Sequence, residues 1–380
     1  MIYADNATTT RLSDAAFEKM LPFLKDHYGN ASSQHSSGIK AKQAIQHARK
    51  QVAAAIGADT SEIIFTSGGS EGNSWVIQGV TQLFGSEQIH IITSSFEHHS
   101  VLNVCHAIEG RGCSVTYIPI DGSGRVSVQD IISAIRPNTK LVSIMLANNE
   151  IGTIQPIAEL GKVLREKSIL FHTDAVQAVG HISVNVKDLQ VDFLTASAHK
   201  FNGPKGTGFV FCRSDIRLPQ MVFGGGQEHG YRAGTEDVAG IVALGYALEE
   251  SVANMPSVKK QLSSLVEKTI SGLKSNILGI LINCEGSERL PGMINVTFPD
   301  VDGEAMMHML DLKGICVSTS SACNSGKDEP SHVLLALGIS PEQARSSIRI
   351  SYGRYNTMQE VDVILSEICN AYRKILSTRG

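Results

Sequence analysis

The chain has 380 residues, of which 42% are hydrophobic and 18% are charged, and its formal net charge is −4. A chain longer than about 250–300 residues favours two domains, and this composition is typical of a globular protein. The small negative charge gives no indication of nucleic acid or an anionic membrane surface as a partner. We expect neither a signal peptide nor a membrane span, because no basic and apolar leader and no apolar run of about 18 residues occur.

Cysteine usage indicates a reducing compartment. The seven cysteines, an odd number, are spread over the whole chain, and none forms a CxxC pair. A disulfide framework or a structural zinc site is therefore not expected. We expect a cytoplasmic protein that crosses no membrane.

From residue 60 to residue 215, short β-rich runs alternate with helical patterns. Strands are predicted at 62–66, 89–93, 114–118, 141–146, 169–172, 193–196 and 208–212. Helices are predicted at 37–56, 72–83, 101–109, 128–135 and 157–167. Several strands are continuous apolar runs, as in a mostly parallel sheet that is buried on both faces. This pattern predicts an α/β domain, whose ligands gather at the carboxyl ends of the strands.

The pattern changes after residue 237. A long helical stretch reaches about residue 275, and we interpret an interruption near Pro256 as the domain border. Strands predicted at 294–298, 315–319 and 347–352 then mix with helices predicted at 303–313, 330–337 and 358–376. This mixture predicts a smaller α+β domain. We expect the large domain at 13–255 and the small domain at 1–12 together with 256–380.

Lys200 and Asp174 follow two strands of the predicted sheet. Lys200 comes just after the strand at 193–196, and Asp174 closes the apolar run at 169–172. Pyridoxal 5′-phosphate (PLP) requires an amine for covalent attachment and a carboxylate that keeps its ring nitrogen protonated. The pair therefore indicates PLP. The alternative is a surface lysine and a helix N-cap.

Histidines near these strands allow other interpretations of the site. His172, Asp174 and His199 could bind a metal ion, although that alternative leaves the lysine and the glycine-rich turn without roles. His98 and His99 are adjacent, so on a helix their side chains point in different directions, and we do not expect both to chelate one ion. Stacking of one of these imidazoles on a flat cofactor ring is the functional hypothesis, and a surface histidine is the alternative.

Two glycine-rich segments are candidates for binding phosphate. The turn at 65–73 follows a strand and opens a helix, so its backbone N–H groups lie at the positive end of a helix dipole. An ordinary N-capped turn is the alternative. The segment 224–235 is either a mobile loop or a second phosphate contact from a neighbouring subunit. No GxxxxGK[ST] or GxGxxG motif occurs, so the phosphate need not belong to a nucleotide.

Cys323 and Arg349 differ from their surroundings. Cys323 lies in the small, polar stretch 318–328, where we expect the accessible thiol that a reactive cysteine requires. The other six cysteines lie in or beside apolar segments and are expected to be mostly small core residues. Arg349 lies in the alternating pattern 347–351, and its planar fork suits a substrate carboxylate. An internal ion pair is the alternative for Arg349.

Together these segments resemble the cysteine desulfurases of the NifS/IscS group, within the class V aminotransferase-like, fold-type I PLP enzymes. The resemblance is carried by YADNATT at 3–9, GNASS at 29–33, EH at 97–98, NNEIG at 148–152, DAVQ at 174–177, SAHK at 197–200, SSAC at 320–323 and SSIR at 346–349. It covers nearly the whole chain. It implies the PLP-dependent transferase fold of type I, in which a large domain with a mostly parallel seven-stranded sheet is joined to a smaller α+β domain.

The resemblance also implies roles for the candidate residues. Lys200 binds PLP covalently and moves the substrate proton, Asp174 pairs with the ring nitrogen, and His98 stacks on the ring. Arg349, with Asn149, binds the substrate carboxylate. The other implied PLP contacts are Gly69, Ser70, Asn149, Gln177, Ser197, His199 and, from the partner subunit of a homodimer, Thr235.

By the same resemblance, Cys323 takes the sulfur of L-cysteine as a persulfide, and L-alanine is the second product. The sulfur then passes to an acceptor protein, a scaffold or a thiolation enzyme, for iron–sulfur cluster or thio-cofactor biosynthesis. A selenocysteine lyase or another PLP-dependent β-lyase is the alternative enzyme, and a catalytically silent sulfur-relay subunit is the alternative outside enzymes. The chain departs from the family pattern at Thr8, His229, Ala233 and Asn324, where alanine, arginine, often serine, and threonine or serine are usual.

Overall fold

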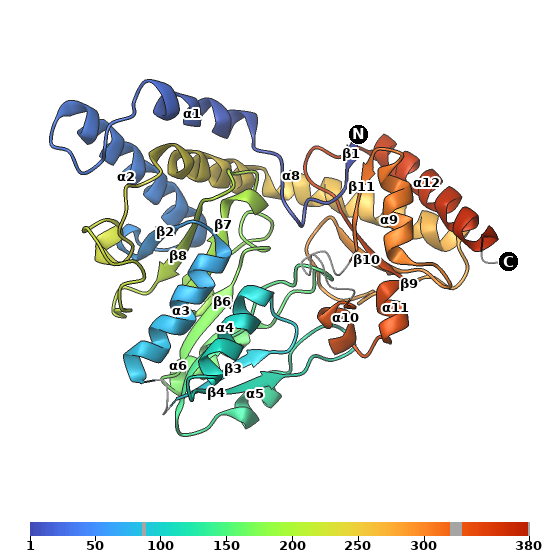
Figure 1. Ribbon diagram of the computed structural model, residues 1–380, viewed down its shortest axis with the longest axis horizontal. Helices are drawn as coiled ribbons and strands as arrows, with labels where there is room; N and C mark the ends of the chain where they lie inside the picture. Colours follow the sequence, from blue (N-terminus) through green and yellow to red (C-terminus); the bar gives the residue numbers. More distant parts are fainter. Residues whose placement is uncertain (86–88, 320–328, 379–380) are drawn as a thin grey trace.

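The structure, a computed structural model, describes residues 1–85, 89–319 and 329–378. In these ranges the elements gather around a sheet of seven strands and a sheet of four strands (Figure 1). The seven-stranded sheet and most of the helices up to α8 form one part, and the C-terminal elements form the other (Figure 1). None of the helices in the described ranges is long and apolar enough to cross a bilayer.

The seven-stranded sheet is mixed but mostly parallel. In spatial order its strands are β2 (Ile63–Thr66), β8 (Gly208–Cys212), β7 (Phe193–Ser197), β6 (Leu170–Asp174), β5 (Thr139–Ser143), β3 (His90–Ser94) and β4 (Ser114–Ile118). β8 runs antiparallel to β2 and β7, and the other neighbouring pairs are parallel. The seven strands predicted from apolar runs are therefore confirmed.

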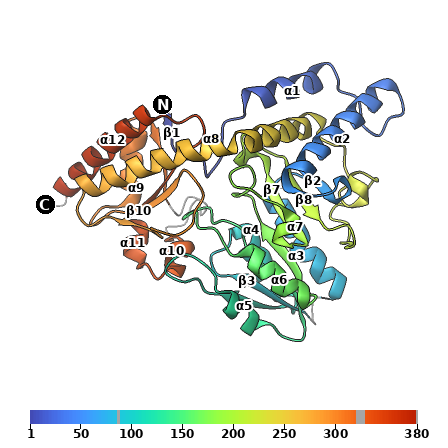
Figure 2. The same ribbon diagram turned by 180° about the vertical axis from the view of Figure 1, so that it is seen from behind.

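Helices cover both faces of this sheet (Figures 1 and 2). The helices and turns of this part are α1 (Asp14–Lys25), α2 (Ser36–Ile56), η1 (Thr60–Glu62), α3 (Gly69–Phe84), α4 (His99–Glu109), α5 (Val128–Ala134), α6 (Ile157–Glu166) and α7 (Val186–Leu189). Ile64 of β2 packs with α3 and α4, whereas the next residue, Phe65, packs with α2 and α6. Successive strand residues thus point into different cores, which explains why the strands are apolar without interruption.

α8 (Val238–Asn276) is a helix of 39 residues that runs through both parts of the molecule (Figure 2). The interruption predicted near Pro256 is wrong, because the helix continues through that residue. A proline removes one backbone hydrogen bond, but packing holds the turns on either side of it. Leu248 is buried in the core of the seven-stranded sheet, and Leu262 is buried in the core of the smaller part. The domain border at residue 256 stays a prediction.

The smaller part is built around an antiparallel sheet. Its elements are β9 (Leu281–Ile282), β10 (Met293–Thr297), α9 (Gly303–Asp311), β12 (Ser318–Thr319), α10 (His332–Ala336), α11 (Pro341–Arg345), β13 (Ser347–Ser351) and α12 (Met358–Ser377). The single strand predicted at 315–319 is instead two short strands, because the chain changes neighbours at Val317. β11 (Ile315–Cys316) pairs in parallel with β1 (Ile2–Tyr3), whereas β12 pairs with β13.

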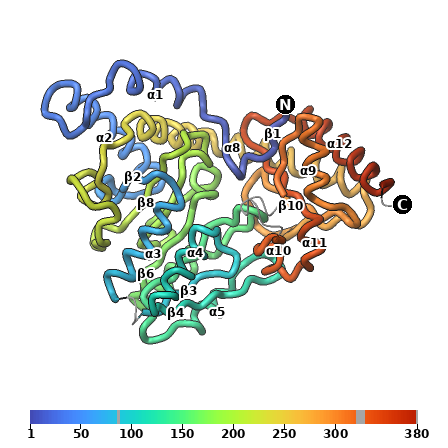
Figure 3. Tube along the Cα trace, viewed as in Figure 1, coloured from blue at the N-terminus to red at the C-terminus, as the bar shows by residue number. Residues whose placement is uncertain are grey.

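The segment 4–13, called the N-terminal strap below, connects the two parts (Figure 3). At one end, Ala4 accepts a hydrogen bond from the backbone N–H of Ser351 of β13 (2.7 Å). At the other end, the N–H of Ser13 donates to the carbonyl oxygen of Asn202, which follows β7 (2.9 Å). The strap then enters α1, for which no helix is predicted. The sequence signal of α1 is weak because, of its own residues, only Ala16 is buried.

A buried ion pair anchors the glycine-rich segment 224–235 to the edge of the large sheet. Glu228, in η4 (Glu228–Gly230), accepts hydrogen bonds from Arg49 of α2 (2.7 Å and 2.9 Å) and from the backbone N–H of Phe65 (2.7 Å). Phe65 lies on β2, an edge strand, so Glu228 satisfies a donor that has no neighbouring strand. Glu228 and His229 both have positive φ angles, 47° and 59°, and this anchoring holds them in the left-handed region.

Candidate active site

A cavity of about 250 Å³ lies where the carboxyl ends of β6 and β7 meet the N-terminal strap and β13. The predicted site residues that line it are Gly69, Ser70, His98, Asn149, Asp174, Gln177, Ser197, His199, Lys200 and Arg349. The carboxyl ends of parallel strands meet at one edge of a sheet, which is why residues so far apart in sequence converge. The lining residues to which the sequence analysis assigned no role in the site are Ala7, Thr8, Ser100, Met145, Ala147 and Val176.

Lys200 is the last residue of η3 (Ala198–Lys200), a turn that follows β7 directly. Its Nζ donates hydrogen bonds to the carbonyl oxygens of Ala7 (2.6 Å) and Thr8 (2.8 Å). The carbonyl oxygen of Ala7 also accepts a hydrogen bond from Nε2 of Gln177 (2.9 Å). The N-terminal strap therefore orients both the amine and the amide at the cavity wall.

Asp174 ends β6, and its carboxylate is buried at the cavity. Oδ2 accepts a hydrogen bond from Nδ2 of Asn73 (2.7 Å), and Oδ1 accepts one from the backbone N–H of Val176 (3.0 Å). Both donors are neutral, so the negative charge of Asp174 can pair with a cationic group in the cavity. Sequence reasoning misses the role of Asn73, because nothing in the sequence marks this helical asparagine as buried.

A chain of hydrogen bonds connects Asp174 with His98. Nδ2 of Asn73 also donates to Oγ of Ser100 (2.9 Å), which lies 2.8 Å from Nδ1 of His98. His98 is the N-cap of α4, and its Nδ1 accepts the backbone N–H of Ser100 (3.1 Å). The proton of the neutral ring is therefore on Nε2. Burial lowers the pKa of His98 and favours the uncharged ring.

The first turn of α3 forms an anion-binding position beside the cavity. Gly68 precedes the helix with a φ of 150°, which favours glycine, and a Cβ on Gly69 would lie only 2.7 Å from Cγ2 of Val176. N–H groups in the first turn of a helix have no intrahelical partner, and the helix dipole favours negative charge there. The residues that line both the cavity and an adjoining hollow at this end are Gly69, Ser70, Ser197 and His199.

Thr235 does not line the cavity. It lies with Ser67 and Arg232 around a separate hollow of about 90 Å³. Nε of Arg232 forms an ion pair with Oε1 of Glu71 in the first turn of α3 (3.1 Å), so the segment 224–235 adjoins the anion-binding position. The structure describes one chain, and a contact of Thr235 from a partner subunit stays a prediction.

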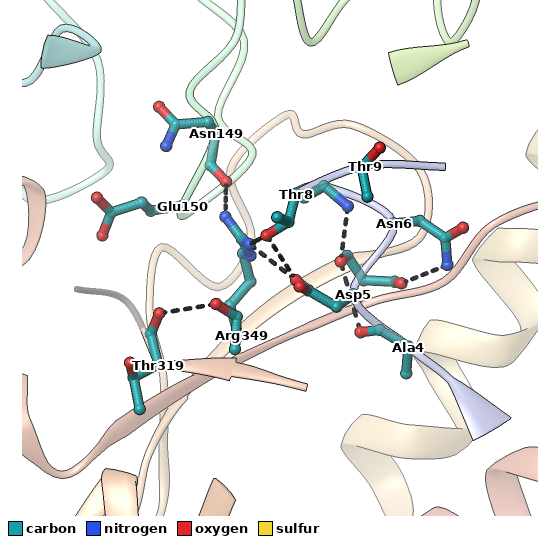
Figure 4. A network of polar contacts seen from close by, with 12 residues as sticks. Ala4, Asp5, Asn6, Thr8, Thr9, Asn149, Glu150, Thr319 and Arg349 are labelled. Atoms are coloured by element: carbon teal, nitrogen blue, oxygen red, sulfur yellow. Dashed lines mark hydrogen bonds and ion pairs between the residues drawn. The ribbon is translucent and has the colours of Figure 1, made fainter. Parts of the chain in front are cut away.

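Arg349 has internal partners in the structure (Figure 4). Its Nη1 donates to the carbonyl oxygen of Asn149 (2.7 Å), and its Nη2 donates to Oδ1 of Asp5 (2.9 Å) and Oγ1 of Thr8 (2.6 Å). The alternative of an internal ion pair is therefore confirmed. A role toward a substrate carboxylate is compatible with it, because the arginine also lines the cavity.

Asn149 and Glu150 connect the cavity with the segment that follows residue 328. Oδ1 of Asn149 is buried and has no hydrogen-bond partner among the described residues, so it is available to a ligand. Oε2 of Glu150 accepts a hydrogen bond from Oγ of Ser331 (2.5 Å), the N-cap of α10. Burial raises the pKa of Glu150 to about 7. Ser331 at the start of α10 is thus held by Glu150, the residue that follows Asn149.

Cys323 itself lies outside the described residues. Of the other six cysteines, Cys316 is half-buried, and the others are buried: Cys105, Cys113, Cys212, Cys284 and Cys369. Burial raises the pKa of each of these thiols, as for Cys113, whose pKa is about 11. Because five of the six are buried, the prediction that most are core residues is confirmed. Raised pKa values also make these thiols poor nucleophiles.

One of the three residues of the alternative metal site, His172, already has partners for both of its ring nitrogens. His172 lies inside the sheet, where Nδ1 is 2.8 Å from Oγ of Ser143 and Nε2 is 3.0 Å from Oγ1 of Thr195. Both ring nitrogens are therefore already hydrogen-bonded to hydroxyl groups. Burial lowers the pKa of His172 to about 3, so the ring is a neutral part of the core.

Burial of His172 makes stability depend on pH. A histidine whose pKa is lower in the folded state binds more protons in the unfolded state, so its stabilising effect is present above pH 6.5 and is lost toward pH 3. We expect the free energy of unfolding to fall by about 1.4 kcal/mol per pH unit below 6.5 on account of this residue. Urea unfolding at pH 7, 6 and 5 should show a shallower fall in His172→Gln than in the exposed control His308→Gln. Equal slopes would contradict the assignment.

Comparisons with known proteins show the family and the fold. The family model Aminotransferase class-V matches residues 2–364. The chain is 45% identical over 366 residues to the cysteine desulfurase IscS of Clostridium botulinum (strain Kyoto / Type A2), covering 96% of this chain and 92% of that protein. Among solved structures, a NifS-like protein has a TM-score of 0.92 at 38% identity, covering 97% of this chain and 98% of that chain. SspA in complex with cysteine has a TM-score of 0.84 at 37% identity, covering 94% and 100%. The chain therefore belongs to the class-V aminotransferase family of PLP-dependent enzymes and, within it, to the NifS/IscS cysteine desulfurases.

Proposed function

We propose that the protein takes sulfur from L-cysteine, releases L-alanine and carries the sulfur as a persulfide on Cys323. The observation that carries this proposal is the cavity in which Lys200, Asp174 and Arg349 meet. These side chains supply an amine, a carboxylate and a guanidinium, which are the groups needed to hold PLP and the carboxylate of an amino acid. The cysteine complex of SspA supports the choice of L-cysteine as the substrate.

The residues of the cavity fit PLP. The Asp174 carboxylate, which accepts hydrogen bonds from the neutral N–H groups of Asn73 and Val176, would pair with the protonated ring nitrogen. The uncharged ring of His98 would stack on the cofactor, and the first turn of α3 would hold its phosphate. Gln177 and Asn149 would contact the ring oxygen and its surroundings. When bound, PLP withdraws electrons from the Cα of the attached amino acid.

The side chains then divide the reaction among them. Arg349 and Asn149 bind the substrate carboxylate, and Lys200 accepts the proton from Cα and returns it. The Cys323 thiolate attacks the substrate sulfur and forms an S–S bond while the C–S bond breaks. The electron pair of the broken bond stays with the three-carbon fragment, which takes up a proton and leaves as L-alanine. The persulfide on Cys323 would then deliver its outer sulfur to a thiol of the acceptor protein.

Two substitutions test this proposal. Reduction of the holoenzyme with borohydride should attach the cofactor to Lys200, as mass spectrometry of peptides would show, and Lys200→Ala should carry no adduct. Cys323→Ala should lower alanine release from L-cysteine by more than about 100-fold, as removal of a nucleophile does. The control Cys369→Ala, at a buried position on α12, should retain activity.

Other outcomes would favour the alternatives. Full activity of Cys323→Ala toward selenocysteine with loss of activity toward cysteine agrees with a desulfurase, whereas unchanged activity toward both indicates a β-lyase. A colourless protein without any borohydride adduct indicates a silent sulfur-relay subunit. A persulfide-trapping pull-down would identify the acceptor, which we propose to be a scaffold or thiolation protein in the cytoplasm.

We propose further that the enzyme is a homodimer in which Thr235 reaches the phosphate of the partner subunit. Support comes from exposed apolar residues on one face of α1: Phe17, Leu21 and Leu24, which are 47%, 45% and 57% exposed. Their spacing places them on one side of the helix, and such patches mark interfaces. Phe223, beside the segment 224–235, is 83% exposed.

Sedimentation velocity tests the dimer. Leu24→Asp places a charge in the proposed interface and should shift the protein toward the monomer. Leu312→Asp is the matched control, because Leu312 is 85% exposed on the smaller part of the molecule, and it should leave the sedimentation coefficient unchanged. A wild-type protein that sediments as a monomer at micromolar concentration would contradict the proposal.

The hydrogen bonds of Asn73 generate a further prediction. Asn73→Ala removes the donor to Asp174 and to Ser100, so the carboxylate and the His98 ring lose their fixed orientation. We expect PLP to bind about tenfold more weakly, the equivalent of about 1.4 kcal/mol. Titration of apoenzyme with PLP, followed by absorbance, measures this change, and the exposed Asn254→Ala serves as control. An affinity for PLP within twofold of the wild type would contradict the role of Asn73.

A further inference from the structure

The guanidinium of Arg349 is surrounded by internal acceptors at the cavity wall (Figure 4). Its side chain is only 4% exposed, and its ion-pair partner Asp5 is 16% exposed. Nη1 donates to the carbonyl oxygen of Asn149, and Nη2 donates to Asp5 and to Thr8. Nε is buried and has no hydrogen-bond partner among the residues that the structure describes. The positive charge is therefore already compensated from within the chain.

This arrangement restricts how a second carboxylate can bind. A guanidinium presents two forks to a carboxylate, one formed by Nε and Nη2 and one formed by Nη1 and Nη2. Both forks include Nη2, and Nη2 has two acceptors, Asp5 (2.9 Å) and Thr8 (2.6 Å). A substrate carboxylate that binds Arg349 through a fork must therefore displace at least one of these two acceptors.

Thr8 holds Asp5 in place. Its Oγ1 accepts the hydrogen bond from Arg349 and donates one to Oδ1 of Asp5 (2.9 Å), so the three side chains form a closed triangle. The backbone N–H of Thr8 also donates to the carbonyl oxygen of Asp5 (3.1 Å), which folds the strap back on itself. The backbone of Asp5 also forms an isolated β-bridge with Ser351 of β13, the strand that carries Arg349. The carboxylate thus has little freedom to leave unless another anion replaces it.

We propose that Asp5, held by Thr8, is an internal competitor that occupies Arg349 until the carboxylate of an amino acid displaces it. This inference rests on the function proposed above, in which Arg349 binds the carboxylate of L-cysteine. The competitor lowers the affinity for every ligand that binds through a carboxylate, and it has no effect on ligands without one. Asp5 and Thr8 therefore set the affinity for the substrate while acting through Arg349.

Steady-state kinetics of the holoenzyme test the proposal with a matched pair of inhibitors. L-alanine and ethylamine differ only by the carboxylate, so their inhibition constants separate carboxylate binding from amine binding. Asp5→Asn should lower both the KM for L-cysteine and the inhibition constant of L-alanine roughly tenfold, and should leave that of ethylamine unchanged. Thr8→Ala should lower the same two constants by a smaller factor. Thr8→Ser keeps the hydroxyl group and should have the wild-type KM. In each variant, KM should change more than kcat.

Asp14→Asn serves as a control, and Arg349→Gln distinguishes a failure of this inference from a failure of the proposed function. Asp14→Asn also removes an Asp–Arg pair near the start of the chain, but this pair with Arg11 is exposed, and KM should not change. A higher KM in Asp5→Asn and Thr8→Ala would overturn the proposal, because Asp5 would then only position Arg349. If Arg349→Gln removes the preference for L-alanine over ethylamine but Asp5→Asn does not alter it, only this inference fails. If Arg349→Gln does not alter the preference either, the carboxylate-binding role of Arg349 in the proposed function fails as well.

Discussion

The hydrogen bonds of the N-terminal strap determine how the two sheets and the cavity between them are arranged. One end of the strap is bonded to Ser351 of the smaller sheet, and the other end is bonded to Asn202 after the larger sheet. Between these ends, its backbone carbonyl groups accept the hydrogen bonds of Lys200, and its side chains surround Arg349. Each such bond contributes only about 1 kcal/mol. Their importance lies in geometry, because the same ten residues fix a cation from each part of the molecule.

At the Asp174 end of the cavity, the carboxylate is held by neutral groups. Asp174 is bonded to amides, His98 is kept uncharged by burial, and the first turn of α3 offers backbone N–H groups. A buried charge is costly unless it is compensated, and compensation by dipoles leaves it available to pair with a ligand of the opposite charge. Asn73 matters here because its two amide protons bind Asp174 and Ser100 together. Its position couples the orientation of the carboxylate to that of the imidazole.

Much of this arrangement could be predicted from the sequence. The seven strands could be predicted because both faces of the large sheet are buried, which makes most of the strands apolar runs. Lys200 and Asp174 could be assigned to one site because the carboxyl ends of neighbouring parallel strands lie at the same edge of the sheet. α1 was not predictable, because it buries almost nothing of its own, and the continuity of α8 through Pro256 depends on packing at both ends.

The polar network of the cavity could be predicted only in part. The family resemblance indicated the side chains expected to contact the ligand, but not the residues that support them. Thr8 was visible only as a departure from the usual pattern, and its contact with Arg349 depends on the strap folding back over residues that are 341 positions away. The ion pair of Arg49 with Glu228 likewise joins residues separated by 179 positions. Such contacts follow from tertiary structure, which local sequence patterns do not specify.

The continuity of α8 also affects how the molecule unfolds. A helix of 39 residues is about 58 Å long, and its two halves are buried in different cores. Loss of either core exposes half of this rod and leaves the other half with a frayed end. Unfolding of one core therefore destabilises the half of α8 that is buried in the other core, so we expect the two cores to unfold cooperatively. Pro256, near the midpoint, lacks the backbone N–H of an ordinary helical residue, so the rod has one hydrogen bond fewer between its two halves.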